Sequence, residues 1–263
     1  MSRAFTQLSR PNWNSILSRP LTLNALTTIR GALLDSHKPP ELASLDKKQN
    51  AAILIPFCNV QDVPGILLQV RSRTMRSHSG EVSCPGGKVD ELLDLSLVDT
   101  ALRETFEELG ISRERIEILG SGGPPEQSLR GDSVWPFVGF VHSSEAFDRS
   151  CLDDHDPLPS IDLDAIERTS SKDEVAAVFH LPLAELANPS RQIPHLFRGN
   201  RTYWAIDVSD LVSARESGTP LATEFQRDEV GSGRDGRVEV WGLTGWFVYL
   251  ISQQILGFPR AQL

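Results

Sequence analysis

The chain has 263 residues, 40% of them hydrophobic, a length and composition expected of one sizeable domain with additions rather than two full cores. The formal net charge of −9 leaves no basic stripe that could neutralise phosphates, which argues against nonspecific binding to nucleic acid. No apolar run approaches the roughly eighteen residues of a membrane span, and the 3 cysteines lack C-x-x-C spacing, which fits a reducing compartment and excludes a disulfide framework and a zinc site.

The N-terminal segment, residues 1–37, has two interpretations. Its first 34 residues contain 4 arginines, several serines and no acidic residue, a composition that resembles a mitochondrial transit peptide. Pro11 and Pro20 interrupt any long amphipathic helix, however, and Leu21–Leu34 has the apolar spacing of an ordinary helix. A targeting region and a helix of the fold are therefore both expected alternatives.

Two strands are predicted after a polar linker at residues 38–50. Ala51–Phe57, AAILIPF, is a short apolar run, and this pattern predicts a buried strand. Gly65–Ser72, GILLQVRS, predicts a second strand. We expect the main domain to occupy residues 38–257, with residues 258–263 as a C-terminal tail.

A basic segment follows the second predicted strand. It contains Arg71, Arg73, Arg76 and His78. Three arginines in six residues usually form a solvated loop. In an acidic protein, directly ahead of the carboxylates described next, a local cluster of guanidinium groups is what a phosphate-rich substrate requires. We therefore interpret the segment as anion-binding.

The stretch Ser83–Ile111 leads from a glycine pair to an amphipathic helix. Its apolar stripe spans about 100° of arc and comprises Val98, Ala101, Leu102, Thr105 and Leu109. The carboxylates of Glu104, Glu107 and Glu108 share an adjoining face. Like charges so close weaken a helix by a few tenths of a kcal/mol per pair (about 0.2–0.5), and a bound divalent cation reverses that cost.

These carboxylates suit a hard cation such as Mg²⁺ or Mn²⁺, which prefers oxygen ligands. A solvated acidic face is the usual alternative for an ExxEE pattern on its own. The predicted turn at Gly86 and Gly87 favours the metal site, because glycine lets backbone carbonyls and amides approach the same ion and a phosphate.

At these residues the chain resembles the Nudix box, G-x5-E-x7-R-E-U-x-E-E-x-G-U, where U is aliphatic. Its second half is matched position for position by Arg103, Glu104, Glu107, Glu108, Gly110 and Ile111. Thr105 stands where an aliphatic residue is usual. The spacing from Gly87 to Arg103 is two residues longer than in the standard box, so that Asp94 and Glu91 are both candidates for its first acidic position.

The basic segment resembles a further motif, LLxxRSxxxxxHxGxxxFPGG, of the coenzyme A diphosphatase branch of that family. Matching residues are Leu67, Leu68, Arg71, Ser72, His78, Gly80, Pro85, Gly86 and Gly87. Cys84 replaces the phenylalanine of the motif. The branch pattern GGKxDxxDxS is followed by Gly87, Lys88, Asp90, Asp94 and Ser96, with one extra residue before Asp94.

The remaining chain predicts alternating strands, loops and a last helix. Residues 134–141 and 201–208 read as strands, and residues 142–171 as an irregular insertion. Residues 173–186 read as a strand and a short helix, where Glu174 is either a distal base or a structural residue. Residues 211–237 read as a charged, glycine-rich loop and residues 238–257 as a strand end and a terminal helix, whose aromatic residues we expect in the core.

The resemblance covers residues 21–257 and implies an α/β fold, the Nudix α/β/α sandwich around a mixed β-sheet. It implies that Mg²⁺ or Mn²⁺ is held by Glu104 and Glu108, assisted by Glu107 and the Gly87 carbonyl, and that Arg103 orients the carboxylates. Arg71, Arg76 and His78, with Gly86 and Gly87, are implied substrate-binding residues. The implied reaction is attack of water on a pyrophosphate.

The first hypothesis is a diphosphatase of coenzyme A or its thioesters that releases 3′,5′-ADP and a 4′-phosphopantetheine product. The alternatives are hydrolysis of another nucleoside diphosphate derivative, such as NADH or ADP-ribose, and a nucleotide-binding module without activity. The final Ala261-Gln262-Leu263 resembles a peroxisomal targeting tripeptide, which competes with the mitochondrial interpretation of the N-terminus. Neither the oligomeric state nor the acyl preference follows from the sequence.

Overall fold

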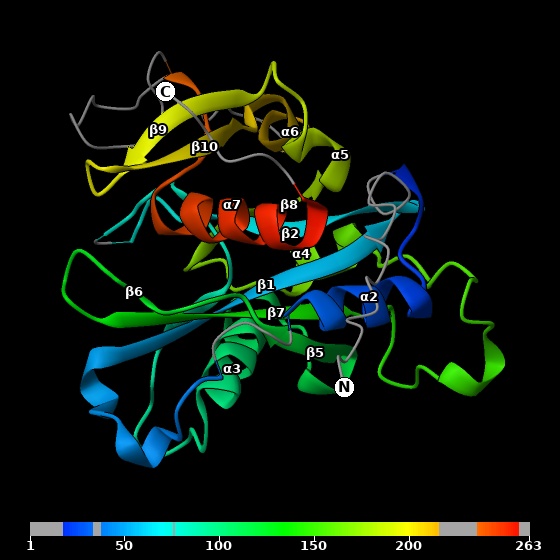
Figure 1. The fold of residues 1–263 in the computed structure, drawn as a ribbon, viewed down its shortest axis with the longest axis horizontal. Helices are drawn as coiled ribbons and strands as arrows, with labels where there is room; N and C mark the ends of the chain where they lie inside the picture. Colours follow the sequence, from blue (N-terminus) through cyan, green and yellow to red (C-terminus); the bar gives the residue numbers. More distant parts are fainter. Residues whose placement is uncertain (1–17, 34–37, 76, 216–235, 258–263) are drawn as a thin grey trace, which may run out of the picture.

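The computed structural model describes residues 18–33, 38–75, 77–215 and 236–257. Arg76, the first part of the N-terminal segment and the C-terminal tail lie outside these residues, so the predictions made there stay predictions. Figure 1 shows the arrangement of the elements. Within the described ranges, none of the helices has both the length and the apolar character needed to cross a membrane.

The strands form one large mixed sheet and one small sheet. Those of the large sheet are β1 (Asn50–Val60), β2 (Val63–Arg71), β3 (Val82–Ser83), β4 (Gly86–Lys88), β5 (Ile116–Ser121), β6 (Glu126–Gln127), β7 (Ser133–Val141) and β8 (Val175–Pro182). Those of the small sheet are β9 (Gln192–Phe197), β10 (Arg201–Asp207) and β11 (Glu239–Val240). The α-helices are α2 (Leu23–Leu33), α3 (Leu97–Leu109), α4 (Leu163–Thr169), α5 (Leu183–Leu186), α6 (Ser209–Ser213) and α7 (Gly242–Leu256).

The centre of the large sheet is the strand β1. It pairs antiparallel with β2 and parallel with β7, and the path of paired strands runs β3-β2-β1-β7-β5. Side chains of β1 alternate between two hydrophobic clusters, with Ile55 and Phe57 in one and Leu54 and Cys58 in the other. A strand buried on both faces is continuously apolar, which is why the predicted run at residues 51–57 was recognisable.

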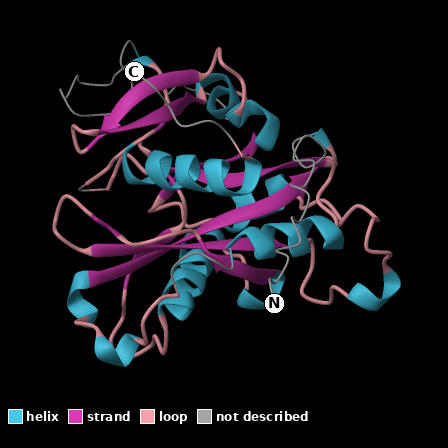
Figure 2. Ribbon diagram, in the orientation of Figure 1, coloured by secondary structure: helices cyan, strands magenta, loops and turns pink. Residues whose placement is uncertain are grey.

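Helices cover both faces of this sheet (Figure 2). Helices α3 and α4 supply buried residues to the cluster that contains Leu54, and α2 and α7 supply them to the cluster that contains Ile55. Helix α7 also packs on β10, between the large sheet and the hairpin of β9 and β10 (Figure 1). The predicted α/β/α arrangement around a mixed sheet is confirmed.

Pro136 lies within β7 although proline cannot donate a backbone hydrogen bond. Its carbonyl accepts from the N–H of Gly122, so the proline nitrogen faces the same connection between β5 and β6. Ser121 pairs with Phe137 and Glu126 with Val134, which leaves Pro136 opposite the gap between these two strands. The predicted strand therefore forms without losing a donor from its ladder.

The N-terminal part of the described chain is fastened to the end of β1 by Asn59. This fully buried amide accepts a hydrogen bond from the N–H of Leu21 at 2.8 Å and donates to the carbonyls of Leu21 at 3.0 Å and Leu158 at 2.8 Å. Helix α2 follows directly, with Leu26, Ile29 and Leu33 buried, as the helical interpretation of residues 21–34 predicts.

Glu126 on β6 connects the small sheet and α7 to the large sheet. Its carboxylate pairs with the guanidinium of Arg201 on β10 and accepts a hydrogen bond from the indole Nε1 of Trp246 at 3.0 Å. Trp246 stacks on Phe197 with ring centroids 4.8 Å apart. Trp246, like the buried Phe247 and Tyr249, belongs to the core, as predicted for the aromatic residues of the terminal helix.

Candidate active site

Helix α3 carries the three candidate carboxylates beside the sheet. The Ser96 hydroxyl caps its first turn by accepting from the N–H of Asp99, and Gly110 ends it in the left-handed conformation with φ 69°. The predicted stripe is buried at Ala101, Leu102, Thr105 and Leu109 and half-buried at Val98. On the adjoining face, Glu108 is 2% exposed, Glu104 is half-buried and Glu107 is exposed.

Arg103 binds the carboxylates around it. Its Nη1 donates to Glu104 Oε1 at 2.9 Å and to Glu107 Oε2 at 2.8 Å. Its Nη2 donates to the backbone carbonyl of Lys88 at 2.9 Å. The guanidinium thus fixes one oxygen of each of two candidate ligands, which agrees with the orienting role that the family resemblance implied.

Of the two candidates for the first acidic position of the box, Asp94 is the one that binds Arg103. Its carboxylate accepts from Arg103 Nε at 2.9 Å and Nη2 at 3.0 Å, and also from the hydroxyl of Thr100 at 2.8 Å. Burial is the largest single influence and opposes its ionisation, but the hydrogen bonds from Arg103, the Asp90 N–H and Thr100, with the charge of Arg103, together outweigh burial, and the pKa of Asp94 lies below its usual value. Glu91, the other sequence candidate, lies on the surface 3.9 Å from Lys48 Nζ.

The longer loop projects into solvent, whereas Asp94 within it is buried. The N–H of Asp94 donates to the carbonyl of Asp90, which closes a tight turn. The Asp90 side chain accepts from the N–H groups of Leu92 and Leu93. Both leucines point to solvent, Leu92 being 94% exposed. Leu92 and Leu93 therefore extend the turn into solvent, while Asp94 faces Arg103.

The glycine pair is a strand rather than the predicted turn. Gly86 and Gly87 belong to β4, which pairs with Ile53 and Ala52 of β1. A Cβ at Gly86 would lie 2.4 Å from the Ala52 carbonyl oxygen, and one at Gly87 would lie 2.5 Å from the carboxylate of Glu104. Glycine is required here by the close approach of two strands and a carboxylate, which the sequence pattern did not distinguish from a turn.

The carboxylate of Glu108 meets three donors from the sheet. Its Oε2 accepts from the N–H of Gly86 at 2.9 Å and from Nε2 of Gln69 at 2.9 Å, and its Oε1 lies 3.5 Å from Arg71 Nη1. Burial raises the pKa of Glu108 to about 7, although these donors act in the opposite direction. Because the Gly86 amide is bound by Glu108, the predicted contact of Gly86 with a phosphate stays a prediction.

Glu104 is also a carboxylate with a raised pKa. Burial is the main cause, Arg103 opposes it, and the negative charges of Glu107 and Glu174 add to it. The exposed Glu174 therefore lies within electrostatic range of Glu104, as a distal base would. Its backbone carbonyl accepts from the N–H of Ser72 at 2.8 Å, which is a structural contact, so both predicted roles of Glu174 are compatible with its position.

Of the predicted anion-binding residues, Arg71 contacts a candidate carboxylate and His78 contacts Glu81. Arg71 contacts Glu108 from the end of β2, since residues 67, 69 and 71 alternate onto the face that α3 covers. His78 lies in the connection to β3 with φ 56°, an uncommon conformation for a residue with a side chain, and its Nδ1 is 2.9 Å from Glu81 Oε2. The hydrogen bond that its imidazole donates to Glu81 raises the pKa of His78.

Arg130 joins this basic region and was not anticipated from the sequence. It lies between β6 and β7 in a loop held by Asp132, whose Oδ1 accepts from Lys88 Nζ at 2.8 Å. The charges of Arg71 and Arg130 both act to lower the pKa of His78, so Arg130 lies within electrostatic range of the imidazole. A lone arginine in a loop gives no sequence signal, because only the fold brings it near His78.

The carboxylate oxygens of the site suit a divalent cation, although the side chains are not yet gathered into a metal-binding arrangement. Within the described residues, no three His, Cys, Asp or Glu side chains are gathered as metal ligands, since Arg103 holds Glu104 and Glu107. Among these residues each carboxylate still keeps one oxygen without a hydrogen bond: Glu104 Oε2, Glu107 Oε1 and Glu108 Oε1. Carboxylate oxygens of this kind are the ligands that Mg²⁺ or Mn²⁺ prefers, and Glu104 lies directly against Gly87, where a Cβ would come within 2.5 Å of its carboxylate.

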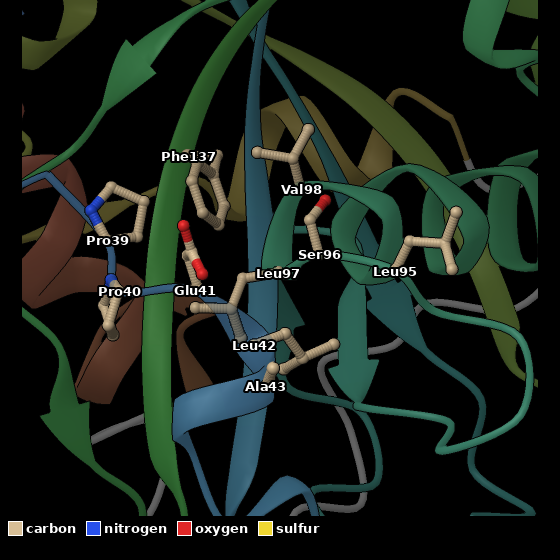
Figure 3. A pocket seen from close by; sticks show the side chains of 10 residues that line it. All are labelled: Pro39, Pro40, Glu41, Leu42, Ala43, Leu95, Ser96, Leu97, Val98 and Phe137. Atoms are coloured by element: carbon tan, nitrogen blue, oxygen red, sulfur yellow. The ribbon is translucent and has the colours of Figure 1, made fainter.

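A pocket of about 370 Å³ lies near the start of α3, apart from the carboxylates (Figure 3). It is formed by residues 39–43 on one side and residues 95–98 on the other, with Phe137 between them. None of the three candidate carboxylates lines it. We therefore assign the candidate site to the carboxylates and the basic residues and not to this pocket.

Comparison with known proteins points to one family. The model of the NUDIX domain matches residues 47–196. The uncharacterized Nudix hydrolase NudL of Cronobacter sakazakii is 38% identical over 152 residues, which span 58% of this chain and 66% of that protein. NudL of Pectobacterium atrosepticum is 29% identical over 221 residues, 84% of this chain and 90% of that protein. The NUDIX domain of Shewanella oneidensis NrtR, solved with ADP ribose, is 20% identical over 60% of this chain and 85% of that one, with a TM-score of 0.34.

Proposed function

The chain belongs to the Nudix family, and we propose that it is a hydrolase that cleaves the pyrophosphate bond of coenzyme A or of its thioesters. The products are 3′,5′-ADP and 4′-phosphopantetheine or its acyl derivative. The observation that supports a phosphate-rich substrate is the meeting of Arg71 with Glu108, at 3.5 Å between Nη1 and Oε1. A guanidinium group that can bind phosphate oxygens therefore lies next to a candidate metal ligand.

Nudix hydrolases generally use divalent ions such as Mg²⁺ or Mn²⁺. In the proposed enzyme the ion would be held by Glu104 and Glu108, assisted by Glu107 and the carbonyl of Gly87. Such an ion neutralises charge on the phosphoryl oxygens and lowers the pKa of a water molecule. This chemistry explains why three carboxylates stand together on one helix face, where without a cation they repel one another.

The residues of the chain have separable tasks in this proposal. Arg103 orients Glu104 and Glu107 through its fixed fork of N–H groups, and does not touch substrate. Arg71 and His78 bind substrate phosphates, and Arg76 is proposed to do the same. Glu174, whose charge reaches Glu104, is the candidate to accept a proton from the attacking water.

Product analysis tests the assignment. Purified protein with Mg²⁺ is given coenzyme A, NADH and ADP-ribose in parallel, with EDTA as the control. We expect turnover on coenzyme A to exceed turnover on the other two, with 3′,5′-ADP as a product. Equal or faster hydrolysis of NADH or ADP-ribose would favour the alternative substrate class, and turnover of none would favour a nucleotide-binding module.

Replacement of one carboxylate tests the role of the helix. Glu108→Gln preserves the shape of the side chain and one oxygen that can accept the hydrogen bonds from Gly86 and Gln69. It removes the charge that attracts a cation. We expect kcat to fall by at least about a hundredfold with the fold retained. Circular dichroism checks the fold and the product assay checks kcat; activity near that of the wild type would contradict the metal role.

A further inference from the structure

Gln69 is a polar residue in a position where β2 is otherwise apolar. It is 0% exposed, and its neighbours Leu67, Leu68 and Val70 are buried as well. It shares the face of Leu67, beneath α3, where an apolar side chain would complete the hydrophobic cluster. A buried amide at this place therefore needs a specific partner.

The partner of Gln69 is Glu108. The Nε2 atom lies 2.9 Å from Glu108 Oε2 and 3.4 Å from the hydroxyl of Ser83. Since an ionised carboxylate only accepts hydrogen bonds, the nitrogen of the amide is the atom that faces it. The Oε1 atom of Gln69 is buried and has no partner among the described residues. An unpaired buried acceptor lowers stability, so the amide is costly to the fold.

The two donors to Glu108 act on the same oxygen. Gly86 N–H and Gln69 Nε2 both meet Oε2, each at 2.9 Å. The carboxylate is thereby held at Oε2, and Oε1 is the oxygen that faces Arg71, with Glu104 within electrostatic range of the group. Without Gln69, Oε2 would keep one donor among the described residues, the N–H of Gly86, and the remaining contact of the carboxylate would be Arg71 at Oε1.

We propose that Gln69 is a positioning residue, which holds Glu108 so that Oε1 is directed at the bound cation. The proposal rests on the metal-dependent hydrolysis proposed above. A hydrogen-bond partner behind a metal ligand typically changes metal affinity or activity by about ten- to a hundredfold when it is removed. A purely structural amide would instead affect thermal stability and leave cation binding unchanged.

A double-mutant cycle tests this through cation binding. Gln69→Met, of similar volume, removes the donor, and Ser83→Ala is the matched control that removes only the weaker contact of the same amide. Mn²⁺ binding is followed by the loss of the free-ion electron paramagnetic resonance signal. We expect Gln69→Met to weaken Mn²⁺ binding by at least about tenfold and Ser83→Ala to leave it unchanged.

Gln69→Met is then combined with Glu108→Gln. If Gln69 acts through Glu108, Gln69→Met will weaken Mn²⁺ binding no further in this background, because the charged ligand that Gln69 holds in place is already lost. Unchanged Mn²⁺ binding in the single variant, or an equal loss in both backgrounds, would overturn the proposal. Should Gln69→Met fail to fold, Gln69→Asn, whose shorter side chain retracts the amide, is expected to give the same loss.

Failure of the proposed function gives a different result. A protein that hydrolyses none of the three pyrophosphates but binds Mn²⁺ in a Gln69-dependent way would refute the activity and support the positioning role. Turnover on coenzyme A that is unaffected by Gln69→Met, with Mn²⁺ binding also unaffected, would refute the positioning role alone. Metal-free thermal denaturation of each variant separates both results from a loss of folded protein.

Discussion

Arg103 illustrates why the site requires one residue type at one position. Its planar guanidinium binds a buried carboxylate with two N–H groups on one side and reaches Glu104, Glu107 and the Lys88 carbonyl with the others. A lysine ammonium offers donors from a single point and cannot span these partners. The hydrogen bond with Asp94 raises the pKa of Arg103, so its charge is permanent in the working pH range.

Asp94 and Glu91 give a matched pair of variants. Asp94→Asn removes the charge of a buried ion pair and should destabilise the protein by about 3 kcal/mol, measured by urea denaturation, and lower kcat by about tenfold or more. Glu91→Gln removes a surface charge that interacts at 3.9 Å with Lys48 and should leave both quantities near the wild-type values. A larger loss for Glu91→Gln than for Asp94→Asn would reverse this assignment.

At the residue scale, the sequence predicts the relative positions of side chains that lie close together along one helix. Glu104, Glu107 and Glu108 could be placed together from spacing, because 3.6 residues complete a turn. Gln69 precedes Glu108 by 39 positions and lies on a different element, so only the fold joins them. The choice between Asp94 and Glu91 likewise depended on the course of the longer loop, which spacing does not determine.

At the scale of elements, the loop between β6 and β7 brings an additional cation to the basic region. Arg130→Ala should raise KM for a phosphate-rich substrate by about tenfold while kcat changes little, because the charge of Arg130 acts at His78 and its loop stays held by Asp132. Steady-state kinetics measures the two constants. Leu129→Ala, an exposed neighbour in the same loop, is the control, and an equal effect of both variants would argue against a role of the charge.

A second polar cluster fastens α2 and the connection after β7 to the strand β5. The carboxylate of Glu117 accepts hydrogen bonds from Arg30, His142 and Arg149. Burial opposes ionisation of Glu117, but these hydrogen bonds outweigh it and lower its pKa to about 2. The pocket beside this cluster, about 300 Å³ in volume, lies away from the carboxylates of α3.

This pKa shift predicts a pH dependence of stability. Because the folded-state pKa of Glu117 lies below the unfolded value of 4.5, the ionised form stabilises the fold above about pH 4.5, and that contribution is lost as the pH falls toward 2. Glu117→Gln should cost about 2 to 3 kcal/mol near neutral pH. The difference from the wild type in urea denaturation should shrink as the pH is lowered from 6 to 3; a constant difference would contradict the linkage.

The elements predicted from sequence are those with strong periodicity or continuous apolar character. Strands β1, β2 and β7 and helix α7 were predicted from their apolar runs, and helix α3 was predicted because its buried residues recur at the helical period. Strand β5 was not, since its burial does not alternate, and α4 was not, since Ile166 is its buried residue in a polar segment predicted to be irregular. Weak local patterns are decided by packing partners distant in the sequence.

At the scale of the whole molecule, the match to the NUDIX domain ends before β10, yet the later elements share the same core. Tyr203, Val240 and Phe247 are buried in the cluster that also contains Phe57 of β1. The C-terminal part from β10 onward is therefore a covering layer of the large sheet. The predicted division at residues 38–257 stays a prediction.

The two predicted localisation signals lie at opposite ends of the chain. We propose that Ala261-Gln262-Leu263 directs the protein to peroxisomes, with a mitochondrial signal at the N-terminus as the alternative. Untagged protein and a variant that lacks residues 261–263 are compared by immunofluorescence with markers of both organelles. Loss of peroxisomal signal in the variant is expected, whereas mitochondrial signal in both would favour the N-terminus.

Asn59 has a consequence for shortening the chain from its N-terminal side. The pair of hydrogen bonds between its side-chain amide and the backbone of Leu21 imitates one rung of a β-ladder. A deletion that removes Leu21 would leave this buried amide, at the end of the central strand, with one of its three hydrogen bonds, the bond to the carbonyl of Leu158. Deletions that end before Leu21 and deletions that pass it should therefore differ sharply in the stability of the folded protein.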